Sequence, residues 1–366
     1  MYVGYSPLFQ NRDNARSDLE VYQNELRLAE MAEPLGFDSV WSVEHHFTDY
    51  TMVPDVVQFL SYMAGKTSRV KLGSMVVVLP WHDPMRVAEQ ISMLDNLSGG
   101  RMILGIGRGL GRVEYDGFRL NMGESRETFS EYADIVLNGL ENGYCEKDGK
   151  FVKQPKRDIR PRPFKSFKGR TFAAAVSPES MPIMAELGVG LLVIPQKPWK
   201  EVKKDFDDYH RFFREANGVD APSPLCGGFY YVDENADRAE AIGMKYISDY
   251  YKTVIKHYEF MDTHLHGLKG YEFYSGISKY LTKRGVDGAS EDFAKLMPWG
   301  TPEQVYDKLM YIRTLIGQAG VMGHFSYANM PYDMAEKSLK LFAKEVMPEL
   351  QKVPAESPAY ADAETA

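Results

Sequence analysis

The sequence predicts an α/β protein of the (β/α)8 class, a TIM barrel with insertions. Three observations support this prediction: short apolar runs alternate with longer amphipathic segments, the runs are apolar at successive positions, and eight run-and-helix pairs can be counted. Strands that are apolar on both faces are typical of parallel sheets covered by helices. Repeated over 366 residues, this order favours a closed barrel over an open sheet.

The predicted strands are short apolar runs, and the predicted helices between them carry apolar residues at helical spacing. The strands are Tyr2–Tyr5, Ser39–Val43, Val70–Leu79, Met102–Ile106, Thr171–Ala175, Leu191–Ile194, Leu225–Tyr231 and Gly323–Tyr327. The helices are Ser17–Pro34, Val53–Gly65, Pro84–Leu97, Glu127–Gly139, one from Pro178, one through Phe213, Pro302–Ile316 and Pro331–Met347. The Thr301–Gln304 segment has the form of a capping box at the start of one of these helices.

Two segments interrupt this rhythm. Residues 144–170 are rich in Lys, Arg and Pro, and residues 260–296 are aromatic and contain glycines without a clear period. We expect both to be excursions from a single domain that spans residues 1–352. Residues 353–366 have the composition of a disordered tail.

Composition narrows the function. The formal net charge of −8 disfavours nucleic acid or an anionic membrane as a main partner. Two cysteines, Cys145 and Cys226, exclude a disulfide scaffold and fit a reducing compartment. No leader is evident, and the longest apolar runs, such as Met75–Pro80, are too short to span a bilayer. A cytoplasmic protein without a membrane segment is expected.

Glu44, His45 and His46 stand where the second predicted strand ends. Active sites of barrels lie at the carboxyl ends of the strands. Successive strand residues point to opposite faces, so one histidine is expected at the barrel mouth and the other outside it. A histidine at the mouth can act as a general acid or base, although a hydrogen-bonded structural pair is the alternative.

A glycine-rich turn, Gly105–Arg112, follows the fourth predicted strand. It is not a dinucleotide-binding GxGxxG motif, because Leu110 occupies the third glycine position. Its free N–H groups and arginines suit a phosphate, whereas a loop that simply needs positive φ angles is the alternative. Ser177 and Pro178 have the form of a helix start, which is either an anion site or a plain cap.

A basic stretch and a group of histidines do not define a site. The ten Lys and Arg residues of Lys147–Arg170 either steer an anionic cofactor or form a solvated loop. His257, His264 and His266 lack the spacing of metal ligands, so no metal is assigned.

Several motifs in one order are similar to those of the bacterial luciferase-like flavin monooxygenases, over residues 1 to about 352. They are Gly36–Trp41, Glu44–Thr48, Val78–Pro80, Asp83–Glu89, Leu94–Arg101, Arg108–Leu110, Gly300–Glu303 and Val346–Pro348. The resemblance, which includes the luciferase α subunit, implies a (β/α)8 barrel and a mobile segment over its mouth. It also implies reduced FMN, supplied by a separate flavin reductase, and O2 as co-substrate.

The resemblance also implies roles for single residues. His45 matches the catalytic histidine of the family. The phosphate of FMN is expected at Arg108, Arg126, Ser177 and Ser180. Its ring is expected against Met75 and Val76, joined by a cis peptide in many members, and beside Gly107. Glu44, Trp81 and His82 are candidates for the wall of the substrate pocket.

The expected function is that of a two-component, FMN-dependent monooxygenase. Through a flavin C4a-peroxide, it would oxygenate an apolar small molecule such as an aldehyde, a ketone or a terpenoid-like compound. The family also implies a homodimer. Gly107 stands where the light-emitting members have a reactive cysteine, which argues against light emission. A deazaflavin-dependent hydride-transfer enzyme and a non-catalytic flavin-binding accessory subunit are the alternatives.

Overall fold

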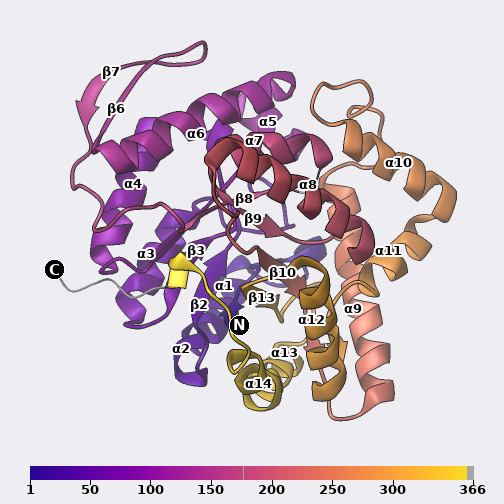
Figure 1. Ribbon diagram of the computed structural model, residues 1–366. Helices are drawn as coiled ribbons and strands as arrows, with labels where there is room; N and C mark the ends of the chain where they lie inside the picture. Colours follow the sequence, from indigo (N-terminus) through magenta and orange to yellow (C-terminus); the bar gives the residue numbers. More distant parts are fainter. Residues whose placement is uncertain (176, 361–366) are drawn as a thin grey trace.

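The computed structural model describes residues 1–175 and 177–360, and its centre is a closed barrel of parallel strands (Figure 1). Neighbouring strands follow the order β3-β2-β1-β13-β10-β9-β8-β5, and pairing of β3 with β5 closes the ring. These strands are β1 (Tyr2–Tyr5), β2 (Ser39–Ser42), β3 (Lys71–Ser74), β5 (Met102–Gly107), β8 (Thr171–Ala174), β9 (Gly190–Val193), β10 (Leu225–Phe229) and β13 (Gly320–His324). The predicted (β/α)8 barrel is confirmed.

Small residues make room for a large one inside the barrel. Trp41 on β2 is fully buried. A Cβ atom at Gly73 on the neighbouring strand β3 would lie 2.2 Å from its indole ring, and one at Gly4 on β1 would lie 2.8 Å from it. Glycine on both flanking strands therefore lets the indole fill the interior, since close packing leaves no room for overlap.

Two predicted strands differ from the observed ones. The run Val70–Leu79 divides into β3 and the short β4 (Val77–Val78), which pairs with β5. The last strand is Gly320–His324 rather than Gly323–Tyr327, because the buried residues Phe325 and Tyr327 prolong the apolar run beyond the strand. A second small sheet pairs β11 (Tyr231–Val232) with β12 (Trp299–Gly300), where one strand Leu225–Tyr231 was expected.

Helices surround the barrel, as Figure 1 shows. They are α1 (Asp18–Glu30), α2 (Ala32–Leu35), α3 (Val56–Lys66), α4 (Pro84–Leu97), α5 (Arg112–Phe118), α6 (Ser125–Asn142), α7 (Met181–Glu186), α8 (Trp199–Asn217), α9 (Ala236–His257), α10 (Glu272–Arg284), α11 (Val286–Ala294), α12 (Pro302–Ile316), α13 (Tyr332–Leu341) and α14 (Met347–Gln351). Within the described ranges, no helix is both long enough and apolar enough to cross a membrane.

Helix ends follow local capping chemistry. Asp83 caps α4, its carboxylate accepting the N–H of Arg86 at 3.0 Å, and Pro84 occupies the first helical position. The predicted capping box at α12 is confirmed, since Thr301 and Gln304 each accept the backbone N–H of the other. These local signals explain why both helices have the predicted bounds.

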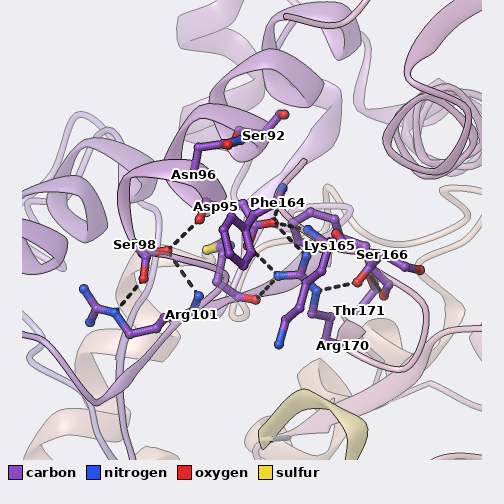
Figure 2. A network of polar contacts seen from close by, with 12 residues as sticks. Ser92, Asp95, Asn96, Ser98, Arg101, Phe164, Lys165, Ser166, Arg170 and Thr171 are labelled. Carbon is purple, nitrogen blue, oxygen red and sulfur yellow. Dashed lines mark hydrogen bonds and ion pairs between the residues drawn. The ribbon is translucent and has the colours of Figure 1, made fainter. Parts of the chain in front are cut away.

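The first insertion is an antiparallel hairpin of β6 (Tyr144–Asp148) and β7 (Lys153–Asp158), which projects beside α6 (Figure 1). Its return to the barrel is anchored by Arg170, whose guanidinium binds both carboxylate oxygens of Asp95 on α4 at 2.6 and 2.8 Å. Figure 2 shows this buried pair and the polar groups around it. Arg170, the last cation of the basic stretch, is therefore a structural residue.

The second insertion contains α10 and α11, which lie beside α9 (Figure 1). The C-terminal segment differs from the expected disordered tail. Tyr360 is buried, stacks on Tyr2 with ring centroids 3.9 Å apart, and its hydroxyl lies 3.0 Å from the Ser39 hydroxyl. The stacking of Tyr360 on Tyr2 holds this segment in place, although the residues around Tyr360 in the sequence are polar or small. Residues 361–366 of the expected tail lie outside the described residues.

Candidate active site

A cavity of about 240 Å3 lies at the carboxyl end of the barrel. Its lining residues follow the ends of successive strands: Glu44 and His45 after β2, Met75 and Val76 after β3, Arg108 after β5. The cavity is also lined by these residues predicted from the sequence: Trp81, Gly107, Arg126, Ser177 and Ser180. Tyr258, Phe260 and Tyr274, at or near the second insertion, complete its wall.

Two arginines converge on one oxygen atom at the cavity. Arg108 Nη1 and Arg126 Nη2 donate to the carbonyl oxygen of Gly270, at 2.7 and 3.1 Å. Arg108 also lies over the ring of Tyr271, 4.0 Å from its centroid. Within residues 1–175 and 177–360, neither arginine has a carboxylate within 4.0 Å. Two half-buried cations directed at one oxygen, with only the exposed Glu272 carboxylate acting on them from a distance, are suited to an anion with several oxygens.

Ser177 and Ser180 supply hydroxyl groups to the same cavity, and their Oγ atoms lie 2.9 Å apart. Ser177 precedes a 3-10 turn (Pro178–Ser180) and has Pro178 at the first position, as expected. Its side chain makes no capping bond to the backbone, and α7 beyond the turn has only six residues. The expected helix start is therefore short, and what remains for a ligand is the hydroxyl pair.

Met75 and Val76 form an apolar wall. The peptide between them is cis, in agreement with the family resemblance. Across the wall, a Cβ atom at Gly107 would lie 2.3 Å from Cγ2 of Val76. A cysteine at this position would therefore require Val76 to move. Glycine at position 107 leaves the main chain of the β5 turn directly open to the cavity.

His45 is paired with a buried carboxylate. Its Nδ1 lies 2.8 Å from Oε1 of Glu114 on α5, which also accepts the backbone N–H of His46 at 3.1 Å. Burial raises the pKa of Glu114, but the nearby rings of His45 and His257 together outweigh it and bring that pKa down to about 2. The ionised carboxylate only accepts hydrogen bonds, so Nδ1 of His45 carries the proton.

The other ring nitrogen of His45 is thereby left to face the cavity. Its Nε2 lies 3.5 Å from the hydroxyl of Tyr258, which lines the same cavity. A neutral His45 presents a lone pair there, and a protonated His45 presents an acid. The arrangement can hold or move a proton at one atom beside the cavity.

A second carboxylate, Glu44, organises the remaining histidines. Its Oε1 accepts from Nε2 of His46 at 3.1 Å and from Nε2 of His82 at 2.6 Å. Its Oε2 accepts the N–H of Val78 at 3.0 Å. Burial alone would lower the pKa of His82, but the Glu44 carboxylate outweighs it and raises that pKa. His82, expected at the substrate pocket, is not among the lining residues of the cavity and instead supports Glu44.

Sequence reasoning missed Glu114 and did not use His257. Glu114 stands between Val113 and Tyr115 in a short helix, where a glutamate is usually solvated. It is fully buried because His45 and His257 come to it from distant parts of the chain. The signal that could have found Glu114 is its place just beyond the glycine-rich turn, in the loop region where barrels carry their functional groups.

Comparisons with known proteins found similar sequences. A family model described as luciferase-like monooxygenase matches residues 1–318. The α chain of alkanal monooxygenase from Photorhabdus luminescens is 26% identical over 340 residues, which cover 92% of this chain and 94% of that one.

Solved structures share the fold. The monooxygenase RslO1 from Streptomyces bottropensis matches with a TM-score of 0.80 and 24% identity, over 96% of this chain and 100% of that chain. The oxygenating constituent of 3,6-diketocamphane monooxygenase from Pseudomonas putida was solved with FMN. It matches with a TM-score of 0.74 and 18% identity, over 97% of this chain and 100% of that chain. The coenzyme F420-dependent tetrahydromethanopterin reductase from Methanopyrus kandleri matches with a TM-score of 0.63 and 21% identity, over 95% of this chain and 98% of that chain.

Proposed function

Because this chain belongs to the luciferase-like monooxygenase family, we propose that it is a two-component, FMN-dependent monooxygenase of an apolar small molecule. A separate flavin reductase would supply reduced FMN, and O2 would be the co-substrate. Bound reduced FMN supplies the electrons with which one oxygen atom of O2 is transferred to the substrate. The remaining tasks fall to this chain: holding the cofactor, excluding water and managing protons.

The single observation that carries this proposal is the pair Arg108 and Arg126. Both guanidinium groups meet at one oxygen, that of Gly270, and have no carboxylate partner within 4.0 Å in the described part of the chain. A phosphate offers several such oxygens and a negative charge that can contact both guanidinium groups. The hydroxyls of Ser177 and Ser180, on the same cavity, add neutral donors. These residues fit the phosphate end of FMN.

The apolar part of the cavity fits a flavin ring and an apolar substrate. Met75, Val76 and Leu110 line it, with the indole of Trp81 nearby. Phe260 and Tyr274 cover it from the second insertion. Such a lining excludes water from the reacting groups. We propose an aldehyde, a ketone or a terpenoid-like compound as substrate, since these are apolar and carry little charge.

His45 is the residue that we propose to manage protons in the reaction. Glu114 orients its ring through Nδ1, which leaves Nε2 on the cavity side. An imidazole fixed in this way can give or take a proton at its Nε2 atom. Its contact with both the cavity and a buried carboxylate distinguishes it from His46, which packs against Trp81 and Phe118.

Hydride transfer with a reduced deazaflavin is the second candidate. The fold is shared with the F420-dependent reductase, and a deazaflavin cofactor also carries a phosphate that the arginines suit. The two candidates differ in their need for O2. An accessory subunit that only binds flavin would form no product with either cofactor.

A substrate panel with a flavin reductase, NADH and FMN under air tests the proposal. We expect mass spectrometry to find a product 16 mass units heavier than one panel member, and no product under nitrogen. Product formation under nitrogen with reduced deazaflavin would instead establish the second candidate. Tight flavin binding without product in any condition would establish the accessory subunit.

A further inference from the structure

A second cavity lies behind His45, away from the proposed cofactor site. It has a volume of about 300 Å3 and is separate from the first cavity. Most of its lining side chains are polar or charged, and they come from four segments: Arg12, Asp13, Thr48, Asp49, Tyr50, Val113, Lys252, Thr253, Lys256, His257 and Glu259. The polar groups among these side chains can bind ordered water.

His257 lies between this second cavity and the carboxylate that holds His45. It is the last residue of α9, it stacks on Tyr50 with centroids 4.4 Å apart, and its side chain is 1% exposed. Its Nδ1 lies 3.1 Å from the hydroxyl of Thr48, at the second cavity. Its Nε2 faces Glu114 Oε1 at 3.5 Å without forming a hydrogen bond.

Nε2 of His257 and Oε2 of Glu114 are buried and have no hydrogen-bond partner in the described part of the chain. Leaving such atoms unpaired costs about 1–3 kcal/mol each. Most buried polar groups in stable structures have a hydrogen-bond partner, so these two adjacent side chains retain unused hydrogen-bonding capacity. The Nε2 atom of His257 lies 3.5 Å from Oε1 of Glu114, the oxygen that also contacts His45.

We propose that His257 completes a proton-exchange path between water in the second cavity and His45. The path runs through the Thr48 hydroxyl, His257, Glu114 and His45, with separations of 3.1, 3.5 and 2.8 Å. That His45 uses these protons in a reaction rests on the proposed function, whereas the path itself does not.

Each step of the path conserves protons. When Nε2 of His45 gains a proton at the first cavity, Nδ1 releases its own to Oε1 of Glu114. Glu114 passes a proton to Nε2 of His257, and Nδ1 of His257 releases one through Thr48 to water. One proton enters and one leaves, and the reverse sequence returns a proton to His45.

The charges around His257 keep it able to accept and release a proton. Burial lowers its pKa, so the ring is neutral at physiological pH and offers one free lone pair. The groups that face it come from α5, from the loop after β2 and from the end of α9: Glu114, His45, Asp49, Lys256, Tyr258 and Glu259. Glu259 is bound by Arg112 at 2.7 Å, and Lys256 lies near Asp13 and Asp49, so cations offset part of the negative charge around the ring.

Nuclear magnetic resonance of cofactor-free protein labelled with 15N-histidine tests the path. The readout is the rate at which the Nδ1 proton of His45 exchanges with water, with its signal identified by its loss in His45→Gln. We expect exchange at least tenfold slower in His257→Gln and in Thr48→Val. His210→Gln is the matched control, because His210 on α8 is also a partly buried histidine but contacts none of these groups. It should change the rate less than twofold.

Unchanged exchange in both His257→Gln and Thr48→Val, with melting curves that show folded protein, would overturn the proposal. The proposal would also be overturned if elemental analysis found one equivalent of a transition metal in the wild type and none in His257→Gln. The atoms of His45, Glu114 and His257 lie within 4.8 Å of one another and would then be a metal site.

Turnover provides an independent readout once a substrate is found. The path predicts a kcat about tenfold lower for His257→Gln, with KM changed less than twofold and a larger solvent deuterium isotope effect. His210→Gln should match the wild type in all three. If the wild type forms no product, the proposed function fails and the exchange rates still decide the path. If the wild type forms product and His257→Gln has a normal turnover and a normal exchange rate of the His45 Nδ1 proton, the proposed path is wrong and the proposed function stands.

Discussion

Replacing Arg126 by glutamine should weaken the binding of FMN but not that of riboflavin. In the structure, Nη2 of Arg126 lies 3.1 Å from the oxygen of Gly270, which stands where we expect an anionic oxygen. A hydrogen bond to a charged group contributes about 1.5–3 kcal/mol, so the dissociation constant for FMN should rise about 10- to 150-fold. Arg108→Gln should have an effect at least as large, because it also loses the contact with Tyr271.

Quenching of flavin fluorescence on titration with protein measures both affinities. Riboflavin lacks the phosphate, so its dissociation constant should change less than threefold in either variant. Arg112→Gln is the matched control, because that arginine is the last residue of the same turn but is held by Glu259 at 2.7 Å. If Arg126→Gln weakened FMN and riboflavin equally, or left FMN unaffected, the assignment of the phosphate end would be wrong.

Three more predictions concern single residues. His45→Ala should abolish product formation while the dissociation constant for FMN changes less than threefold, measured by turnover and fluorescence; normal turnover would remove the proposed role. Asp95→Ala should lower the free energy of unfolding by about 3–5 kcal/mol in urea, because Arg170 is left charged and buried (Figure 2), and a loss under 1 kcal/mol would refute this account. Burial raises the pKa of Glu25 to about 7, so the folded chain retains a proton that the unfolded chain releases near pH 4.5. Stability should therefore fall by about 3 kcal/mol as pH rises from about 4.5 to 7.5, and this slope should be absent in Glu25→Gln.

The barrel could be predicted because its signals are local. Each strand is a short apolar run, and helices such as α4 and α12 begin at capping residues that act within four positions. The errors arose where tertiary packing decides. Phe325 and Tyr327 are buried beyond the end of β13, so the apolar run does not mark the strand. Tyr360 is held by Tyr2, which lies at the other end of the chain.

The candidate site shows the same division. The resemblance pointed to His45, Arg108 and Arg126, and the structure places them around one cavity. The partners of these residues could not be predicted, because they are set by the closure of the barrel. Glu114 has no local feature of a buried carboxylate, and His257 is separated from His45 by 212 positions along the chain. His82 follows Trp81 directly, yet only the fold shows that it binds Glu44 and not the cavity.

A single-turnover reaction with 18O2 tests the central claim most directly. The protein is loaded with one equivalent of reduced FMN without oxygen and then mixed with 18O2 and the substrate panel. We expect one 18O atom in one organic product, in an amount near that of the FMN oxidised, and none in the His45→Ala variant. Complete oxidation of FMN by the wild type without 18O in any product, together with product formation from reduced deazaflavin under nitrogen, would contradict the account.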